Sequence, residues 1–191
     1  MMTRKKILAA ALGLTCMLTF QQVGNLFAQE VGKGEIPEAQ LAASYKKLDW
    51  GVQIWDNSEA ISSLQSAEKL LWVDTRPASF FVKGTVANAV NLAYDKIDSE
   101  GNTLSAESLA TAITDAGLSK DETRIVFFCQ GPKCHRSYNA SYTAVNDWGY
   151  SADNVIWYRD GYPNLFSEVK ADVKLKRKAA RYISKEGIGE L

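Results

Sequence analysis

Three short apolar segments restrict the fold of this 191-residue chain more than any other feature. They are Leu70–Val73, Ile125–Phe128 and Val155–Tyr158. Continuous apolar runs of this length are typical of strands that are covered on both faces. Helical patterns lie between them, and strands that alternate with helices predict an α/β fold with a mostly parallel sheet.

Two of the intervening segments carry the start and stop signals of helices. Ser105 is suited to the N-cap of the first helix and Gly117 to its end. A second helix is predicted over Arg136–Trp148, with Gly149 after it. One face of the first helix is apolar, through Leu109, Ala112, Ile113 and Ala116.

Chemically reactive side chains follow the three predicted strands. Asp74–Arg76, Cys129 and Arg159–Gly161 come directly after them. In parallel sheets, ligands bind at the carboxyl ends of the strands. If the three strands are parallel, these residues share one edge of the sheet.

The first 28 residues have the pattern of an export signal. Three basic residues, Arg4–Lys6, precede the uncharged 14-residue run Ile7–Phe20, and Ala28 offers a small residue before a cleavage point. The run is too short for a bilayer-spanning helix. We therefore expect a periplasmic or secreted protein without stable membrane insertion after cleavage; the alternative is an uncleaved anchor.

Removal of residues 1–28 changes the charge and the cysteine content. The whole chain has 22 basic and 22 acidic residues, and the loss of three basic residues leaves 19 against 22. This balance gives no argument for nucleic acid as a partner. Only Cys129 and Cys134 remain, in a compartment where thiols tend to be oxidised.

The rest of the chain divides into three parts. Residues 29–49 are polar and are interpreted as a linker that leads into a short helix around Glu38–Lys47. Residues 50–169 form the α/β body. Residues 170–191 form a basic tail, interpreted as a solvated helix packed on the domain or as a surface for an anionic membrane or partner.

The segment Cys129–Ser137 follows a predicted buried strand and opens a predicted helix. The backbone N–H groups at such a junction can bind an anion, and they favour the thiolate of a cysteine at its base. Gly131 permits a tight backbone path, and Lys133 and Arg136 add positive charge. The segment is suited to a thiolate that attacks an anionic sulfur or phosphorus compound.

The residues of three segments resemble the rhodanese family of sulfurtransferases, over about Val52–Phe166. The first is Leu71–Arg76, a strand ending in Asp-x-Arg, and the second is Phe81–Leu92 with a final Asn-Leu. The third runs from Ile125 to Leu165 and contains Cys129. The resemblance implies a rhodanese-like fold, with a central, mostly parallel five-stranded sheet and helices on both faces.

The resemblance also implies a reaction. Cys129 would take sulfane sulfur from a small anionic donor as a persulfide and transfer it to a thiol or cyanide. Arg136 matches the basic residue that closes the family's loop and is expected to bind the substrate anion. Gln130, Gly131, Lys133, His135 and Arg76 are the further candidates for substrate binding. No metal or cofactor is implied.

The sequence departs from the family's pattern at several positions. Thr85, Ala87 and Asn88 replace the usual His, Pro and Gly. Six residues separate Cys129 from Arg136, where the family usually has four and related phosphatases have five. Pro132 also removes one N–H from the loop.

Cys134 is a further departure, and three roles remain open for it. It could resolve a Cys129 persulfide or mixed disulfide, form a disulfide without a catalytic role, or stay unpaired. His135 could tune the charge of the cysteine or face solvent in the first helical turn. Arg76 could pair with Asp74 and the loop backbone or contact substrate.

Three functions compete on this evidence. The leading one is an exported single-domain sulfurtransferase. The second is a dithiol redox protein that uses Cys129 and Cys134. The third is a non-catalytic rhodanese-like binding module, against which the retained cysteine and basic residue of the loop count. Fold alone does not separate them.

Overall fold

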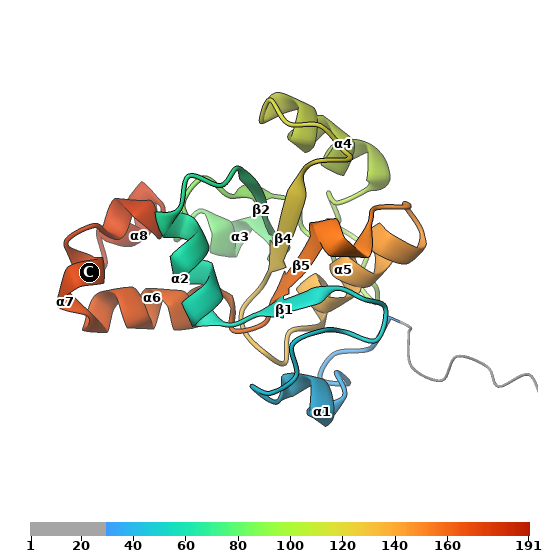
Figure 1. Cartoon of the computed structure of the whole chain (residues 1–191), viewed down its shortest axis with the longest axis horizontal. Helices are drawn as coiled ribbons and strands as arrows, with labels where there is room; N and C mark the ends of the chain where they lie inside the picture. Colours follow the sequence, from blue (N-terminus) through green and yellow to red (C-terminus); the bar gives the residue numbers. More distant parts are fainter. Residues whose placement is uncertain (1–29) are drawn as a thin grey trace, which may run out of the picture.

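A five-stranded parallel sheet forms the centre of the molecule in the computed structural model, which describes residues 30–191 (Figure 1). The predicted export signal, residues 1–28, lies outside this part of the chain. The strands are in the order β1-β5-β4-β2-β3, and every pairing is parallel. Their bounds are Gln53–Trp55 (β1), Leu70–Asp74 (β2), Val90–Asn91 (β3), Arg124–Phe128 (β4) and Val155–Tyr158 (β5). The predicted fold class is therefore confirmed.

The register of the three longest strands brings their carboxyl ends together. Phe128 of β4 is paired with Asp74 of β2 on one side and with Tyr158 of β5 on the other. The residues that follow, Thr75, Cys129 and Arg159, consequently leave the sheet at the same edge. This is the juxtaposition that the three apolar segments predict.

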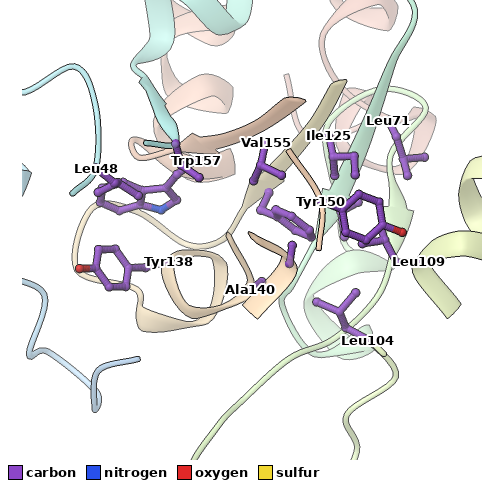
Figure 2. Close-up of a cluster of buried hydrophobic side chains, with 14 of the residues drawn as sticks. Leu48, Leu71, Leu104, Leu109, Ile125, Tyr138, Ala140, Tyr150, Val155 and Trp157 are labelled. Carbon is purple, nitrogen blue, oxygen red and sulfur yellow. The ribbon is translucent and has the colours of Figure 1, made fainter. Parts of the chain in front are cut away.

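Helices cover both faces of the sheet. Helices α4 (Ala106–Asp115) and α5 (His135–Asn146) pack on one face, in a core that Figure 2 shows around Ile125 and Trp157. The opposite face is covered by α2 (Asn57–Gln65), α6 (Gly161–Ala171) and the C-terminal segment. Successive strand residues point to opposite faces, so the fully apolar strands supply both cores.

The predicted helix signals agree with the observed ends to within two residues. Ser105 is the N-cap of α4, and its side chain accepts a hydrogen bond from the Ser108 N–H. Gly117 and Gly149 follow α4 and α5 with positive φ angles of 69° and 70°, a conformation that glycine adopts without strain. Helix α5 begins at His135, one residue before the predicted start, and ends at Asn146. The short helices α3 (Ala78–Phe81) and η1 (Ala152–Asn154) lie in connections.

The segment interpreted as a linker packs against the domain. Its helix α1 covers only Glu38–Leu41, shorter than predicted. Ile36 and Leu48 are buried in the core that contains α4 and α5. Asn139 of α5 accepts a hydrogen bond from the Val31 N–H and donates one to the Val31 carbonyl, both at 2.8 Å. Burial of apolar residues and hydrogen bonds thus attach to the domain a segment whose overall polarity predicts a linker.

The basic tail folds onto the other face of the sheet. It forms α7 (Val173–Lys176), η2 (Ala179–Arg181) and α8 (Lys185–Ile188) rather than one helix. Tyr182 is buried, and its hydroxyl accepts a hydrogen bond from Gln65 at 2.9 Å. Ala179, Tyr182 and Ile183 of the tail therefore complete the core on this face, while the lysines of the tail and Val173 are exposed.

No helix within residues 30–191 is long and apolar enough to cross a membrane.

Replacement of Asn139 tests how firmly the N-terminal segment is attached. Asn139→Ala removes both hydrogen bonds to Val31 from a buried position. We expect the free energy of unfolding to fall by about 1–3 kcal/mol, because the half-buried N–H and carbonyl groups of Val31 lose their partner. Urea unfolding of the oxidised protein measures this. Asn146→Ala, at an exposed position of the same helix, is the control, and an equal loss in both variants would contradict the expectation.

Candidate active site

Cys129 lies at the base of a loop between β4 and α5. Its residue surface is only 1% exposed, whereas Cys134, the N-cap of α5, is partly exposed. The loop turns at Gly131, whose φ of 153° is positive and whose carbonyl accepts a hydrogen bond from the Cys134 N–H at 2.9 Å. The chain therefore doubles back within six residues and directs both cysteines to one place.

The two cysteines form a disulfide, and their Cα atoms are 6.2 Å apart. Cys134 is thus paired in this structure. The alternatives of a resolving thiol and of a disulfide partner remain. The structure holds Cys129 in the form that cannot act as a nucleophile, so chemistry at this residue requires prior reduction.

The turn between β5 and α6 packs against the backbone of the loop. Gly161 has a φ of 73°, and a Cβ atom at this position would lie 2.5 Å from the Cys129 carbonyl oxygen and 2.6 Å from the Gly131 nitrogen. The next residue, Tyr162, donates its N–H to the Cys129 carbonyl at 3.0 Å. Only glycine at position 161 permits this close approach, which fixes the backbone of Cys129.

A cavity of about 740 Å³ opens at the disulfide. All eight residues predicted for the site line it, namely Cys129, Cys134, Arg136, Gln130, Gly131, Lys133, His135 and Arg76. Pro132 of the same predicted loop lines it too, and the lining residues that the sequence does not predict are Lys33, Pro77, Phe80 and Asp95. Asp95 follows the Asn-Leu motif by three residues at the same edge of the sheet, a signal that could have indicated it. Lys33 belongs to the segment interpreted as a linker, where no motif in the sequence indicates that it reaches the site.

Arg76 is held by structural partners. Its guanidinium makes a 2.6 Å ion pair with Asp74, donates to the Gly84 carbonyl at 2.8 Å and to Gln130 Oε1 at 3.1 Å. The guanidinium carbon also lies 4.7 Å from the centre of the Tyr162 ring. Of the two roles open for Arg76, pairing with Asp74 is the one seen, and the residue anchors the loop through Gln130.

Arg136 is also engaged by a carboxylate. Its Nη2 lies 2.6 Å from Asp95 Oδ2, and its Nη1 donates to the Tyr94 carbonyl at 3.2 Å. These two contacts attach the loop after β3 to the start of α5. The guanidinium is still partly exposed and lines the cavity, so its predicted binding of the substrate anion stays a prediction.

His135 does not face solvent, so that alternative is wrong. The residue is 5% exposed, and Nε2 lies 3.1 Å from Asp95 Oδ1. Burial of Asp95 by itself raises the pKa of its carboxyl. Hydrogen bonds from His135 and from the N–H groups of Ile97 and Asp98, with the charge of Arg136, outweigh this and lower the pKa below its ordinary value. The ionised Asp95 therefore organises both basic residues at the start of α5.

The remaining cations of the cavity are Lys33 and Lys133. Both side chains are exposed, and neither forms an ion pair with a carboxylate of the described residues. Phe80, 41% exposed, adds an apolar rim. Within residues 30–191 there is no group of three or more His, Cys, Asp or Glu side chains that could hold a metal ion.

Two departures from the family's motif have a structural account. Thr85 donates its hydroxyl to Asp74 Oδ2 at 2.7 Å and so joins the Asp74–Arg76 pair. Asn88 has a φ of 61° where the family usually has glycine. Asparagine tolerates this left-handed conformation better than other residues with a Cβ atom, so the turn is kept.

The carboxylate of Asp95 gives the site a pH-dependent contribution to stability. Its folded pKa is below 3.8, so its ionised form stabilises the fold. That contribution is complete above the unfolded pKa and is lost as the pH falls from about 3.8 through the folded pKa. We expect Asp95→Asn to destabilise the protein at neutral pH and progressively less below about pH 3.8.

Urea unfolding of both proteins over a pH series, with the disulfide intact, measures this difference. Asp98→Asn is the matched control, because Asp98 is exposed in the same loop. A difference between wild type and Asp95→Asn that stays constant with pH would show that the charge of Asp95 is not what stabilises the loop.

Comparison with known proteins identifies the family. The model of the rhodanese-like domain matches residues 57–168. Among solved structures, the BH2092 protein from Bacillus halodurans is 21% identical, with 60% of this chain and 71% of that chain covered and a TM-score of 0.42. An As-Sb reductase from Leishmania major is 19% identical, with 61% and 78% covered and a TM-score of 0.46.

A third solved structure, an EanB variant in complex with ergothioneine, is 16% identical, with 62% of this chain and 30% of that chain covered and a TM-score of 0.45. The comparison with curated proteins gives no match. Since the family model spans more than half of the sequence and includes Cys129 and its loop, the chain belongs to the rhodanese-like domain family.

Proposed function

We propose that the protein is a sulfurtransferase in which Cys129 accepts sulfane sulfur from a small anionic donor and passes it to a thiol or cyanide. The observation that carries this proposal is the position of Cys129. It lies between a central strand and the first turn of a 12-residue helix, at a cavity of about 740 Å³. Membership of the rhodanese-like family supports the same chemistry.

The first step starts from the reduced protein. The N-terminus of α5 and the nearby cations favour the thiolate of Cys129. With thiosulfate as donor, this thiolate attacks the outer sulfur, a new S–S bond forms, and sulfite leaves with the electron pair of the broken bond. Cys129 then carries a persulfide, which a thiol or cyanide acceptor can attack at the outer sulfur.

The persulfide on Cys129 can also react within the protein, with Cys134. Its thiolate can attack the inner sulfur of the Cys129 persulfide, which forms the Cys129–Cys134 disulfide and releases hydrosulfide. The product is the disulfide of this structure. An external dithiol must then reduce it, and is itself oxidised to a disulfide. Export of the protein, which residues 1–28 predict, would place it where such disulfides persist.

The donor's charge is met by the cations that have no carboxylate partner. Arg76 and Arg136 are paired with Asp74 and Asp95. Lys133 in the loop and Lys33 in the N-terminal segment are the two cavity residues whose ammonium groups are free to approach an anion. We assign the binding of the donor to these lysines and to the backbone N–H groups of the loop.

A dithiol redox protein is the second candidate. The observation in its favour is the disulfide itself, because a Cys129–Cys134 pair that closes in the folded protein can exchange two electrons with another dithiol. The two candidates differ in whether Cys129 carries an extra sulfur atom during turnover.

Mass spectrometry of the intact protein separates them. The reduced protein, freed of reductant, is treated with thiosulfate. We expect a gain of about 32 Da at Cys129, followed by conversion to the disulfide. Cys129→Ser should show no gain. Cys134→Ser should show the gain and keep it longer, because the intramolecular attacker is absent. A wild type that returns to the disulfide without ever gaining sulfur favours the redox function.

Removal of the Lys133 charge tests how the donor is bound. We expect Lys133→Ala to lower kcat/KM for thiosulfate by about fivefold at low salt, the effect of losing roughly 1 kcal/mol from an exposed ionic contact. The loss should shrink at high salt, where charges are screened. Lys176→Ala in the exposed tail is the control. Equal kinetics for Lys133→Ala and wild type at low salt would remove Lys133 from the binding site.

A further inference from the structure

The two sulfur-bearing residues of the disulfide differ in their access to solvent. Cys129 is 1% exposed and lies below the loop, with its carbonyl held by the Tyr162 N–H and covered by Gly161. Cys134 is partly exposed, at the N-cap of α5. A thiolate must reach a sulfur atom along the S–S axis to displace the other, so access decides which sulfur is attacked.

We propose that an external dithiol reduces this site through Cys134, and that Cys129 is shielded from it while the disulfide is intact. The inference takes the need for reduction from the proposed function, while the direction of attack follows from burial. The external thiolate attacks Cys134 Sγ, a mixed disulfide forms, the Cys129–Cys134 bond breaks, and Cys129 leaves as a thiolate. The second thiolate of the dithiol then displaces Cys134, so the dithiol loses two electrons and both protein thiols are reduced.

The identity of the leaving thiolate does not oppose attack at Cys134. Cys134 is the N-cap of α5 and Cys129 is bonded to it, so either leaving thiolate forms near the helix N-terminus, which favours it. Since either sulfur would leave readily, the difference in exposure remains as the deciding factor. The result is a division of roles, in which the buried cysteine takes sulfur and the exposed one exchanges with reductants.

The surroundings of Cys134 fit an incoming thiol. The cavity that it lines is bordered by Lys33 and Lys133, and its rim includes the exposed ring of Phe80. The two ammonium groups attract an anionic thiolate, which can come from a small dithiol or from a cysteine on a protein loop. Both sources share the same reacting group, and the experiment below uses one probe of each kind.

Mapping of the first mixed disulfide tests the proposal. Oxidised wild-type protein is mixed with glutathione, quenched in acid at early times, and its free thiols are blocked with N-ethylmaleimide. Trypsin cleaves after Lys133, so Cys129 and Cys134 fall on separate peptides. We expect at least about tenfold more glutathione on Cys134 than on Cys129. Comparable labelling, or an excess on Cys129, overturns the proposal.

A thioredoxin variant that keeps only its attacking cysteine provides the protein probe for the same mapping. The same excess of adduct on Cys134 is expected with both probes, and the ratio of their rates shows whether a small or a protein thiol is preferred. Comparable labelling of the two cysteines, or an excess on Cys129, by either probe counts against the proposal. Protein unfolded in guanidinium is the control, because the preference for Cys134 should vanish when the fold no longer shields Cys129.

This experiment does not depend on sulfur transfer. If thiosulfate adds no sulfur while the adduct still lies on Cys134, the proposed sulfurtransferase function is wrong and the proposed attack of the reductant on Cys134 is supported. If thiosulfate adds sulfur but the adduct lies on Cys129, the function stands and the present inference fails.

Discussion

Strand β4 is hydrogen-bonded to β2 on one side and to β5 on the other, and the register of these pairings decides where Cys129 lies. Both neighbours are parallel to β4, so all three strands end at the same edge. The turn at Gly161 then contacts the backbone of Cys129 at a distance that excludes any side chain. The position of the cysteine is thus a property of the whole sheet rather than of its own loop.

Two buried carboxylates determine the charge of the site. Asp74 pairs with Arg76, and Asp95 pairs with Arg136 and contacts His135. A buried guanidinium such as that of Arg76 would cost several kcal/mol in lost hydration without a partner, and Asp74 supplies that partner. The half-buried Arg136 is paired with Asp95 in the same way. The consequence is that the two arginines of the cavity are paired with carboxylates, whereas its two lysines are exposed and unpaired among the described residues. The ion pairs connect the loop to neighbouring strands, and the attraction of anions falls to the lysines, whose charge the solvent screens.

The sequence predicts the sheet and the loop after β4 because their signals are local. Ile125–Phe128 is apolar on both faces, and Cys129 with the following helix start is adjacent in the chain. Asp95 and Lys33 could not be predicted in the same way. Their roles depend on contacts between β3, the N-terminal segment and α5, which no periodicity encodes. His135 shows the same limit, since its burial follows from the Asp95 carboxylate 40 residues away.

The length of the loop connects these observations. The family usually has four residues between its cysteine and its basic residue, and this chain has six. The longer loop lets the backbone turn at Gly131, so Cys134 comes back to Cys129 with a Cα separation of 6.2 Å, within the range that a disulfide requires. It also carries Arg136 into the first turn of α5, where Asp95 binds it. The same spacing therefore accompanies two features of this loop, a second sulfur bonded to Cys129 and an ion pair between Arg136 and Asp95. If Cys129 accepts sulfur as we propose, the disulfide blocks the accepting atom, so sulfur transfer would depend on the redox balance of the surroundings.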